Sequence, residues 1–281
     1  MTKTVSANGL RFAYLEWGDS SKPLVLMAHG FPDSPHAWTE LGSALAAAGY
    51  WAVAPFLRGY APSEAGPRDT TSADLAHDGA AWVSAFGREK AHLVGHDWGA
   101  ELAYGAVGVA PEKFLSLTCV AIPHRVRLAF TWKIAWGLRH FGSLSLPWAE
   151  SRFARDDFAE LEMLTRRWSP TWKFTKEDME PVKACFREPG TVHAALGYYR
   201  AAAIRSPEFL KPKVKVPTLV IAGMDDPAVA VSDYESTRAH FDAGFDVVPV
   251  RGGHFCHRES PQETIAAVLA HLAKNQNFTP K

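Results

Sequence analysis

The chain has 281 residues, of which 47% are hydrophobic and 21% are charged, and its formal net charge is zero. This length fits one large domain or a domain that carries an insertion. The balanced charge gives no reason to expect nucleic acid or an anionic membrane as a partner. Since no apolar run reaches the length of a bilayer span, we expect no transmembrane helix and no membrane attachment.

The cysteines and the first residues bear on where the protein works. Cys119, Cys185 and Cys256 are widely spaced and odd in number, so they form no disulfide or metal pattern and indicate a reducing environment. Residues 1–5 contain no apolar signal region and lead directly into strand-like sequence. We expect a cytoplasmic protein that is a monomer or a homodimer.

In chain order, residues 4–16 predict a hairpin that turns at Asn8-Gly9. Short, nearly continuous apolar runs follow, and such runs suit strands that are buried on both faces of a parallel sheet. They are Leu24–Ala28, Trp51–Phe56, His92–Gly95, Leu117–Ile122, Thr218–Ala222 and Phe245–Val250. Helix-like stretches lie between them, for example Trp38–Ala48, Thr71–Phe86 and Trp98–Ala110. The alternation predicts an α/β fold with a mostly parallel, doubly wound sheet.

The pattern changes between the fourth and fifth of these parallel strands. Residues 126–210 contain no convincing strand and are rich in arginine, tryptophan and amphipathic helix. We interpret them as an inserted helical cap above the carboxyl edge of the sheet, where ligands bind in such folds. The core domain would then be 1–125 and 211–281. Half of the ten tryptophans lie in the cap, and we expect most of them to be core anchors: Trp132, Trp136, Trp148, Trp168 and Trp172.

Asp97 is the most informative residue of the chain. It lies in the sequence Gly-His-Asp-Trp-Gly at 95–99, directly after an apolar run and before a helix-like stretch. In hydrolytic enzymes the same strand-to-helix turn usually carries a serine in Gly-x-Ser-x-Gly. The glycines are needed because a Cβ atom there would collide with neighbouring backbone. The pattern therefore predicts a nucleophile turn that presents a carboxylate.

A carboxylate nucleophile selects a particular chemistry. Aspartate is ionised at neutral pH, so Asp97 can attack a saturated carbon without a base and form an alkyl ester. Attack on an amide or ester would give a high-energy anhydride, which argues against peptidase and ordinary esterase activity. Epoxides and alkyl halides are the matching electrophiles. The alternative is that Asp97 only caps the following helix. The acid and the histidine that follow along the chain argue against this alternative.

Those partners follow along the chain as an acid and then a histidine. A loop after the strand signal at 217–223 contains Asp225 and Asp226, and Gly253-His254 follows the last strand. His254 would activate water to cleave the ester, and Asp226 would hold its imidazole in the useful tautomer. Asp225 competes with Asp226 for this role, and the register of the motif favours Asp226.

Two backbone N–H groups are candidates for an oxyanion hole. The strand ending at His29-Gly30 and the turn after it can direct the N–H of Phe31 toward the nucleophile, and the N–H of Trp98 begins the next helix. His29 itself is expected to support the turn through hydrogen bonds.

Together these motifs resemble the epoxide hydrolase branch of the α/β-hydrolase superfamily. The likeness rests on His-Gly-Phe-Pro at 29–32, Arg-Gly-Tyr at 58–60, Gly-His-Asp-Trp-Gly at 95–99, Gly-x-x-Asp at 223–226 and Gly-His at 253–254. It covers essentially the whole chain and implies an α/β-hydrolase fold with a cap. The group with an aspartate nucleophile also includes haloalkane and haloacid dehalogenases, so the cap residues must distinguish among them.

The resemblance implies two cap donors that help an epoxide oxygen to leave. Epoxide hydrolases resemble one another in supplying two tyrosines for this purpose, and Tyr199, just before Arg200, matches the second. A buried aromatic pair is the alternative for Tyr198-Tyr199, and it suits Tyr198. The first tyrosine usually lies seven residues before a proline, and His140 occupies that position ahead of Pro147. A histidine can also donate a hydrogen bond to the oxygen.

Two dehalogenase classes are the nearest alternatives. Fluoroacetate dehalogenases resemble this chain in a cap histidine and a cap tyrosine. However, they hold the substrate carboxylate with arginines at the positions where this chain has Trp98 and Glu101. They also have a tryptophan after the cap histidine, where this chain has Phe141. We therefore discount haloacids. Haloalkane dehalogenases match at Asp97-Trp98 but need a second halide donor, which Phe31 cannot provide and a cap tryptophan such as Trp136 could.

A third class is a ligand-binding protein that keeps the fold without catalysis. Such proteins commonly lose a triad member, whereas this chain retains the nucleophile, the acid and the base. The sequence therefore favours hydrolysis of a small apolar epoxide by water, with no metal or organic cofactor. Phe31, Trp98, His140 and Tyr199 would line the substrate site.

Overall fold

An eight-stranded sheet organises the computed structural model, which describes residues 2–125, 136–137, 139–202 and 206–279. The strand order is β1-β2-β4-β3-β5-β6-β7-β8. Pairing is antiparallel from β1 to β4 and parallel from β4 onward. The strands are β1 (Lys3–Ala7), β2 (Leu10–Trp17), β3 (Leu24–Ala28), β4 (Trp51–Pro55), β5 (Ala91–His96), β6 (Phe114–Val120), β7 (Thr218–Gly223) and β8 (Phe245–Val250). The predicted mostly parallel sheet is confirmed.

The burial of the strands follows their place in this order. Every residue of β3, β4, β5 and β7 is buried, because each of these strands has a neighbour on both sides. The prediction that Phe245–Val250 is buried on both faces is wrong. β8 is the last strand of the sheet, and Asp246 and Pro249 are exposed on it. A proline that cannot donate to a ladder is typical of such an edge.

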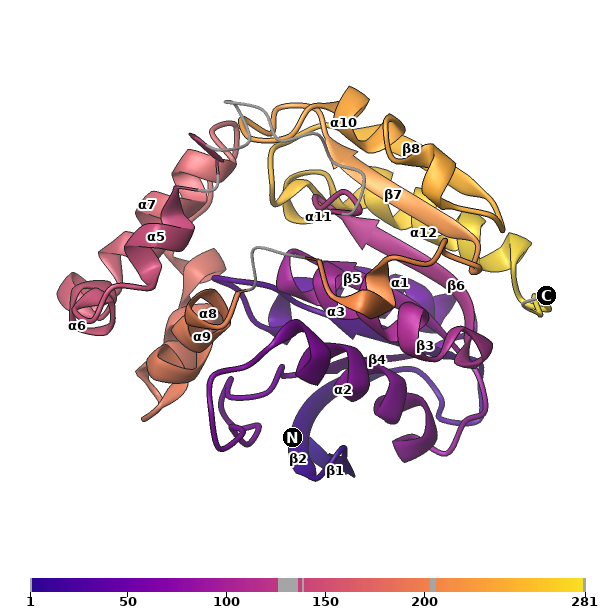
Figure 1. Ribbon diagram of the computed structural model, residues 1–281, viewed down its shortest axis with the longest axis horizontal. Helices are drawn as coiled ribbons and strands as arrows, with labels where there is room; N and C mark the ends of the chain where they lie inside the picture. The colour runs from indigo at the N-terminus through magenta and orange to yellow at the C-terminus, as the bar shows by residue number, and fades with distance from the viewer. Residues whose placement is uncertain (1, 126–135, 138, 203–205, 280–281) are drawn as a thin grey trace.

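Helices cover both faces of the sheet (Figure 1). On one face lie α1 (Thr39–Ala47) and α12 (Pro261–Lys274). On the other face lie α2 (Ser72–Ala85) and α3 (Trp98–Val109). Each face of the sheet has its own cluster of buried apolar side chains. The short helices α10 (Val231–Glu235) and α11 (Cys256–Glu259) follow β7 and β8. Single 3-10 turns lie at Pro35–Trp38, Pro111–Lys113, Arg155–Asp157, Glu208–Leu210 and Arg238–His240.

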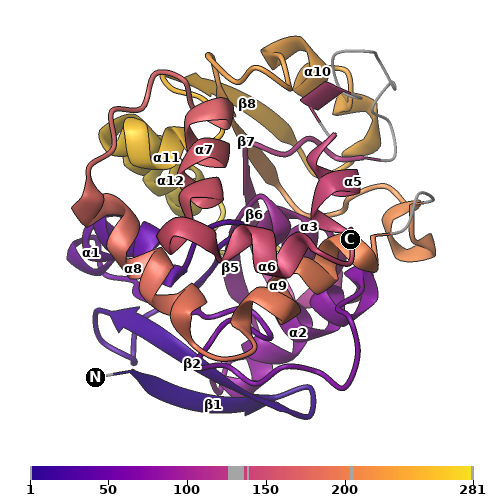
Figure 2. The same cartoon turned by 90° about the vertical axis from the view of Figure 1, so that its left-hand side faces the viewer.

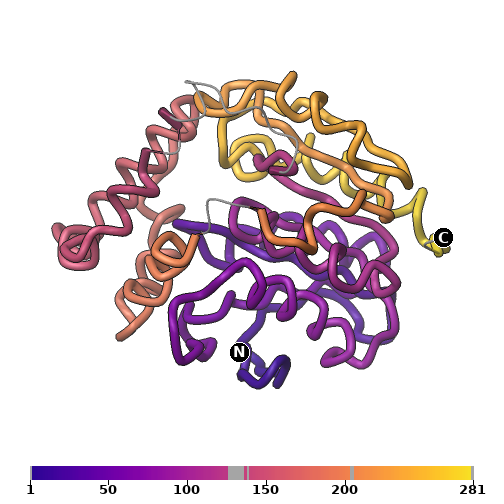
Figure 3. Tube along the Cα trace, in the orientation of Figure 1, coloured from indigo at the N-terminus to yellow at the C-terminus, as the bar shows by residue number. Residues whose placement is uncertain are grey.

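A helical segment separates β6 from β7, although these two strands are hydrogen-bonded neighbours. Its helices are α5 (His140–Leu144), α6 (Ala149–Phe153), α7 (Ala159–Trp168), α8 (Lys176–Arg187) and α9 (Thr191–Arg200). The chain leaves the sheet, forms these helices to one side and returns into β7 (Figure 3). In the turned view the helices lie in front of the strand ends (Figure 2). No strand occurs among the described residues between 136 and 202.

The tryptophans of this segment differ in burial. Trp168 is 6% exposed, but Trp136 and Trp148 are 57% and 58% exposed. The expectation that most of these side chains anchor the core is therefore wrong for Trp136 and Trp148, which lie at the surface. Trp132 is outside the described residues. The three cysteines are free and buried, and within the described ranges no helix is both long and apolar enough to cross a bilayer.

Candidate active site

Asp97 occupies a sharp turn between β5 and α3. Its backbone has φ 52° and ψ −118°, a conformation that costs free energy for a residue with a side chain and recurs at functional sites. The flanking glycines allow the turn to pack closely. A Cβ atom at Gly95 would lie 2.2 Å from the Gly99 oxygen, and one at Gly99 would lie 2.0 Å from the Ala28 oxygen. The predicted strand–turn–helix context of Asp97 is therefore present.

The turn after β3 meets the Asp97 carboxylate. The backbone N–H of Phe31 donates a hydrogen bond of 2.8 Å to Asp97 Oδ1. A Cβ atom at Gly30 would lie 2.4 Å from the Cβ of Asp97, so only glycine allows this approach. The N–H of Trp98 makes no hydrogen bond to the carboxylate among the described residues, although it lies next to Asp97 in the chain. One of the two predicted oxyanion donors, the Phe31 N–H, is thus hydrogen-bonded to a carboxylate oxygen of Asp97.

His254 lies between two carboxylates. Its Nε2 is 3.5 Å from Asp97 Oδ2, and its Nδ1 is 3.6 Å from Asp226 Oδ2. The loop after β8 holds it close to the helical segment, because the His254 N–H donates to the Trp168 oxygen at 2.9 Å. A Cβ atom at Gly253 would lie 2.4 Å from the same oxygen. The three predicted members of the triad are therefore brought together.

The loop after β7 distinguishes the two candidate acids. Asp226 Oδ1 accepts hydrogen bonds from the N–H groups of Ala228 and Val229, which leaves Oδ2 directed at His254. Asp225 instead accepts a hydrogen bond from the Gly252 N–H. Asp226 is 7% exposed, and its Oδ2 has no other partner among the described residues. The geometry favours Asp226 as the partner of the histidine.

The charges around His254 determine its protonation. Burial alone disfavours the imidazolium, but the carboxylates of Asp226 and Asp97 outweigh burial and raise the pKa of His254 to about 9. The histidine is therefore cationic at neutral pH in the free enzyme. Any change that neutralises Asp97 removes part of the stabilisation of the imidazolium.

Tyr199 faces this triad from α9. Its side chain is 4% exposed, and its ring lies 5.1 Å from that of Phe31 and 5.4 Å from that of Trp98, centroid to centroid. Burial, and then the negative charge of Asp97, raise the pKa of Tyr199 well above its ordinary value. The phenol is therefore protonated throughout the physiological range and can act as a hydrogen-bond donor.

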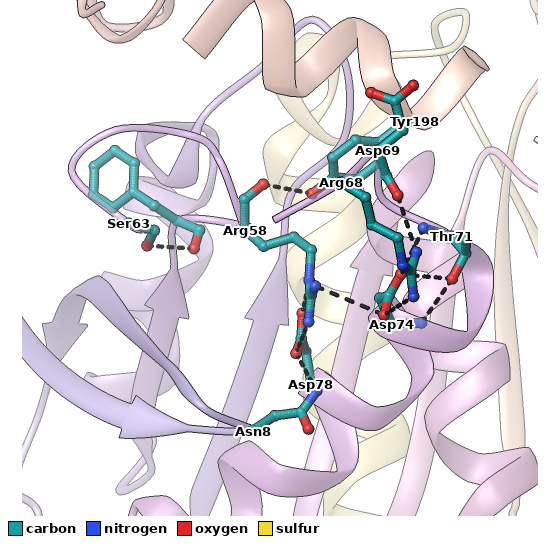
Figure 4. A network of polar contacts seen from close by, with 10 residues as sticks. Asn8, Arg58, Ser63, Arg68, Asp69, Thr71, Asp74, Asp78 and Tyr198 are labelled. Carbon is teal, nitrogen blue, oxygen red and sulfur yellow. Dashed lines mark hydrogen bonds and ion pairs between the residues drawn. The ribbon is translucent and has the colours of Figure 1, made fainter. Parts of the chain in front are cut away.

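Tyr198 has a different role from its neighbour. Its hydroxyl donates a 2.9 Å hydrogen bond to the Arg58 oxygen, which ties α9 to the loop after β4 (Figure 4). The Arg58 guanidinium in turn makes two 2.6 Å hydrogen bonds to Asp78 on α2. This network holds the helical segment against the sheet. The Tyr198 hydroxyl is therefore engaged with the backbone, which agrees with the structural alternative that the sequence offered for Tyr198.

His140 lies near Tyr199, with 5.7 Å between ring centroids. Its Nδ1 is 2.9 Å from the Gly137 oxygen, and because a carbonyl only accepts, Nδ1 must carry the proton. Burial lowers the pKa of His140 to about 4, although that hydrogen bond acts in the opposite direction. At neutral pH the ring is therefore neutral, and its Nε2 has a lone pair rather than a proton.

Further side chains around the site were not predicted individually. The Trp168 ring is 4.7 Å from that of His140 and 5.5 Å from that of His254. The ring of Phe153 is 5.4 Å from that of Phe31. Both residues belong to the helical segment, and its abundance of aromatic residues was the only signal for them. Position along a helix does not reveal which of several aromatics meets the sheet.

Two polar residues near the turn have structural partners. The two ring nitrogens of His29 bond to the backbone of Gly30 and Leu57, which confirms that it supports the turn. The Glu101 carboxylate is 3.3 Å from the Arg125 guanidinium. Glu101 and Arg125 together are formally neutral, so they do not form a cationic pocket for a substrate carboxylate.

The described chain also contains one group of side chains with the spacing of metal ligands, Asp33, His96 and His257. None of them is among the residues predicted to act on substrate. The predicted triad and Tyr199 include the residue types that could serve as nucleophile, base and proton donor in hydrolysis by an aspartate.

The fold and this site define a class of protein. The model of the alpha/beta hydrolase fold family matches residues 23–261, which is most of the chain. The chain therefore belongs to the α/β-hydrolase fold family, as its motifs indicated.

Individual relatives are similar along most of their length. The AB hydrolase superfamily protein YfhM of Bacillus subtilis is 28% identical, with 97% of each chain covered. Human epoxide hydrolase 4 is 29% identical, covering 92% of this chain and 74% of its own. The crystal structure of Bacillus megaterium epoxide hydrolase in complex with an inhibitor aligns with a TM-score of 0.84 over 96% of this chain and 100% of its own, at 23% identity. That structural likeness supports the fold.

Proposed function

We propose that the protein is a hydrolase that converts epoxides to vicinal diols through a covalent alkyl ester on Asp97. The observation that carries the proposal is a carboxylate whose Oδ1 accepts the Phe31 N–H while its Oδ2 lies 3.5 Å from His254. One oxygen is thus held for oxyanion stabilisation, and the other is free to attack. Relatives named epoxide hydrolases support the substrate class.

In the first step Asp97 Oδ2 attacks a ring carbon, and the carbon–oxygen bond of the epoxide breaks. The alkoxide takes the proton of the Tyr199 hydroxyl, since an alkoxide is a poor leaving group without a donor. Alkylation also removes the negative charge of Asp97, one of the two charges that hold the proton on His254. His254 then transfers its proton to the Tyr199 phenolate, which restores the phenol.

In the second step the neutral His254 takes a proton from water, and the hydroxide attacks the carboxyl carbon of Asp97. Negative charge develops on Oδ1 against the Phe31 N–H, with the Trp98 N–H as the second proposed donor. Collapse of this intermediate expels the diol oxygen, which takes the proton from His254. The carboxylic acid left on Asp97 then gives its proton to His254, which restores the carboxylate and the imidazolium of the free enzyme. Asp226 orients the ring and stabilises its charged form. The scheme uses no metal or organic cofactor.

His140 has a narrower role in this proposal than Tyr199. Its Nδ1 proton is used by the Gly137 oxygen, so at neutral pH its Nε2 accepts a hydrogen bond and does not donate one. We assign the donation to the leaving oxygen to Tyr199. His140 lines the substrate site and accepts from a hydroxyl within it. We further propose that residues 126–210 act as the cap that closes over Asp97.

A haloalkane dehalogenase is the second candidate, because Trp168 supplies a buried indole near the triad. Trp136 does not suit this role, since it is 57% exposed. A screen of styrene-oxide-type epoxides and bromoalkanes separates the functions through release of diol or of halide. Diol formation that is lost in Asp97→Ala supports the proposal. Halide release alone would establish the dehalogenase, and binding without any product would establish a ligand-binding protein.

A further inference from the structure

Behind the proposed catalytic histidine lies a second polar cluster that the reaction does not use. Asp33, His96 and His257 each place one potential ligand atom within 4.8 Å of the others. Asp33 follows β3, His96 ends β5, and His257 belongs to α11. Their side chains lie in the interior, because the residues are 1%, 0% and 5% exposed.

Four buried polar atoms of this cluster have no hydrogen-bond partner among the described residues. Asp33 Oδ2, His96 Nδ1 and both ring nitrogens of His257 make no hydrogen bond among the described residues. A buried polar group without a partner is rare in folded proteins, since it loses its hydration and receives nothing in return. Four such atoms from three residues in one place indicate that a polar species belongs among them.

The hydrogen bonding of His96 prepares it to bind a cation. Its Nε2 is 3.0 Å from the His254 oxygen, and because that carbonyl only accepts, Nε2 carries the proton. Nδ1 therefore carries a lone pair, and the His96 ring lies 4.3 Å from that of His257, centroid to centroid. A histidine that ligates a metal commonly donates its other N–H to a backbone carbonyl in this way.

We propose that Asp33, His96 and His257 form a binding site for a divalent transition-metal ion of the Zn²⁺ class, with water as the remaining ligand. Two imidazoles and one carboxylate suit Zn²⁺ and disfavour Mg²⁺ and Ca²⁺, which prefer oxygen ligands. Tetrahedral binding requires ligand atoms about 3.4 Å apart, so the three side chains must close inward by roughly 1 Å.

The surroundings of the cluster include a surface pocket and set a limit on affinity. His257 also lines a surface pocket of about 100 Å³, together with Trp38 and Arg258, so one of the three proposed ligands borders this pocket. The Arg258 Nη1 lies 3.7 Å from Asp33 Oδ1 and leaves Oδ2 available. This fixed positive charge opposes a second cation, so we expect an affinity in the micromolar range rather than that of a closed structural zinc site.

The site would join three segments that carry the proposed catalytic groups. Asp33 lies two residues after Phe31, His96 precedes Asp97, and His257 lies three residues after His254. A bound ion therefore cross-links these segments without contacting the substrate. Its predicted effect is on stability, because a ligand that binds only the folded state raises the melting temperature.

The test uses the full chain without an affinity tag, stripped of metal with a chelator and titrated with ZnCl₂ in a calorimeter. We expect one equivalent of Zn²⁺ per chain and a Tm increase of about 5 °C at a 100-fold excess over Kd. Asp33→Asn and His257→Gln should each weaken binding by at least about 10-fold, since each removes a ligand. His193→Gln is the matched control, because His193 is an exposed histidine paired with Glu150.

Absence of saturable Zn²⁺ binding below millimolar concentration would overturn the proposal, and the cluster would then hold only water. Equal affinity in Asp33→Asn, His257→Gln and the native chain would also overturn it by locating the ion elsewhere. If either variant fails to fold, the visible spectrum of the native chain with CoCl₂ decides. Strong d–d bands are expected for Co²⁺ in the proposed tetrahedral site, and their absence would reject the site. All these readouts are independent of epoxide hydrolysis.

Discussion

The two sides of the site are built in different ways. On the sheet side, Asp97, Asp226 and His254 follow strands, and backbone packing at glycines holds their loops. On the helical side, Tyr199 and His140 are placed by aromatic contacts between helices and by one hydrogen bond to Gly137. In the proposed mechanism the loops after the strands would hold the nucleophile and its base, whereas the helical segment would determine which leaving group receives a proton.

We expect mutations on the two sides of the site to have different consequences. Mutations of the residues that follow the strands would block a covalent step, so they should reduce the activity toward every substrate. Mutations in the helical segment would remove the proton donor for one kind of leaving group. They should therefore slow the reaction of epoxides more than that of substrates whose leaving group needs no proton. The following experiments address this difference.

The largest effect is expected for His254→Gln. Without a base the ester on Asp97 forms but is not hydrolysed, so steady-state turnover should fall by at least about 1000-fold. Intact-protein mass spectrometry should then show a stable adduct of enzyme plus epoxide. An inactive but folded variant that forms no adduct with any substrate of the native enzyme would reject the two-step scheme.

Tyr199→Phe should slow ring opening by about 100-fold, because it removes the donor to the alkoxide. The burst of alkyl-enzyme formation, measured by rapid quench, reports this step. Tyr198→Phe is the matched control. It loses the hydrogen bond to the Arg58 oxygen and should lower stability by about 1 kcal/mol while ring opening changes little. Equal slowing by both variants would show that Tyr199 has no special role.

The pH dependence separates the free enzyme from the alkyl-enzyme. In the free enzyme Asp226 and Asp97 raise the pKa of His254 to about 9, so its imidazolium persists below that pH. Alkylation neutralises Asp97, so the pKa of His254 in the intermediate should be lower by about one unit or more. Decay of the alkyl-enzyme after a pH jump should therefore increase with pH and level off below pH 9. A midpoint at or above 9 would contradict this assignment.

The smallest effect is expected at His140. Because its Nε2 lacks a proton at neutral pH, His140→Ala should change ring opening by less than about 10-fold. His140→Tyr would introduce a hydroxyl donor and should accelerate ring opening relative to His140→Ala. A loss in His140→Ala as large as that in Tyr199→Phe would show that the histidine donates to the leaving oxygen after all.

The sequence predicted the sheet side well for a physical reason. Strand periodicity, the glycines at 95 and 99 and the residues after β7 and β8 are local signals, and parallel strands bring their carboxyl ends to one edge. Asp97, His254 and Asp226 could therefore be selected without knowledge of tertiary contacts. The exposure of β8 was missed because the apolar run does not reveal that the strand has only one neighbour.

The helical side of the site could be predicted less well from the sequence. The burial of Trp168 and the exposure of Trp136 depend on how helices pack, which a composition rich in tryptophan does not specify. The tautomer of His140 depends on the carbonyl of Gly137, three residues earlier in the chain, and no pattern in the sequence predicts that hydrogen bond. Asp33, His96 and His257 come from three separate segments, so only the folded chain reveals their cluster.

In the proposed mechanism an oxygen of Asp97 forms a bond to a carbon of the substrate. A single turnover in H₂¹⁸O, with enzyme in excess over a confirmed epoxide substrate, tests it directly. Water attacks the carboxyl carbon in the second step, so the label should enter the peptide that contains Asp97, and the first diol should carry ¹⁶O. Label in the first diol and none in that peptide would contradict the covalent mechanism.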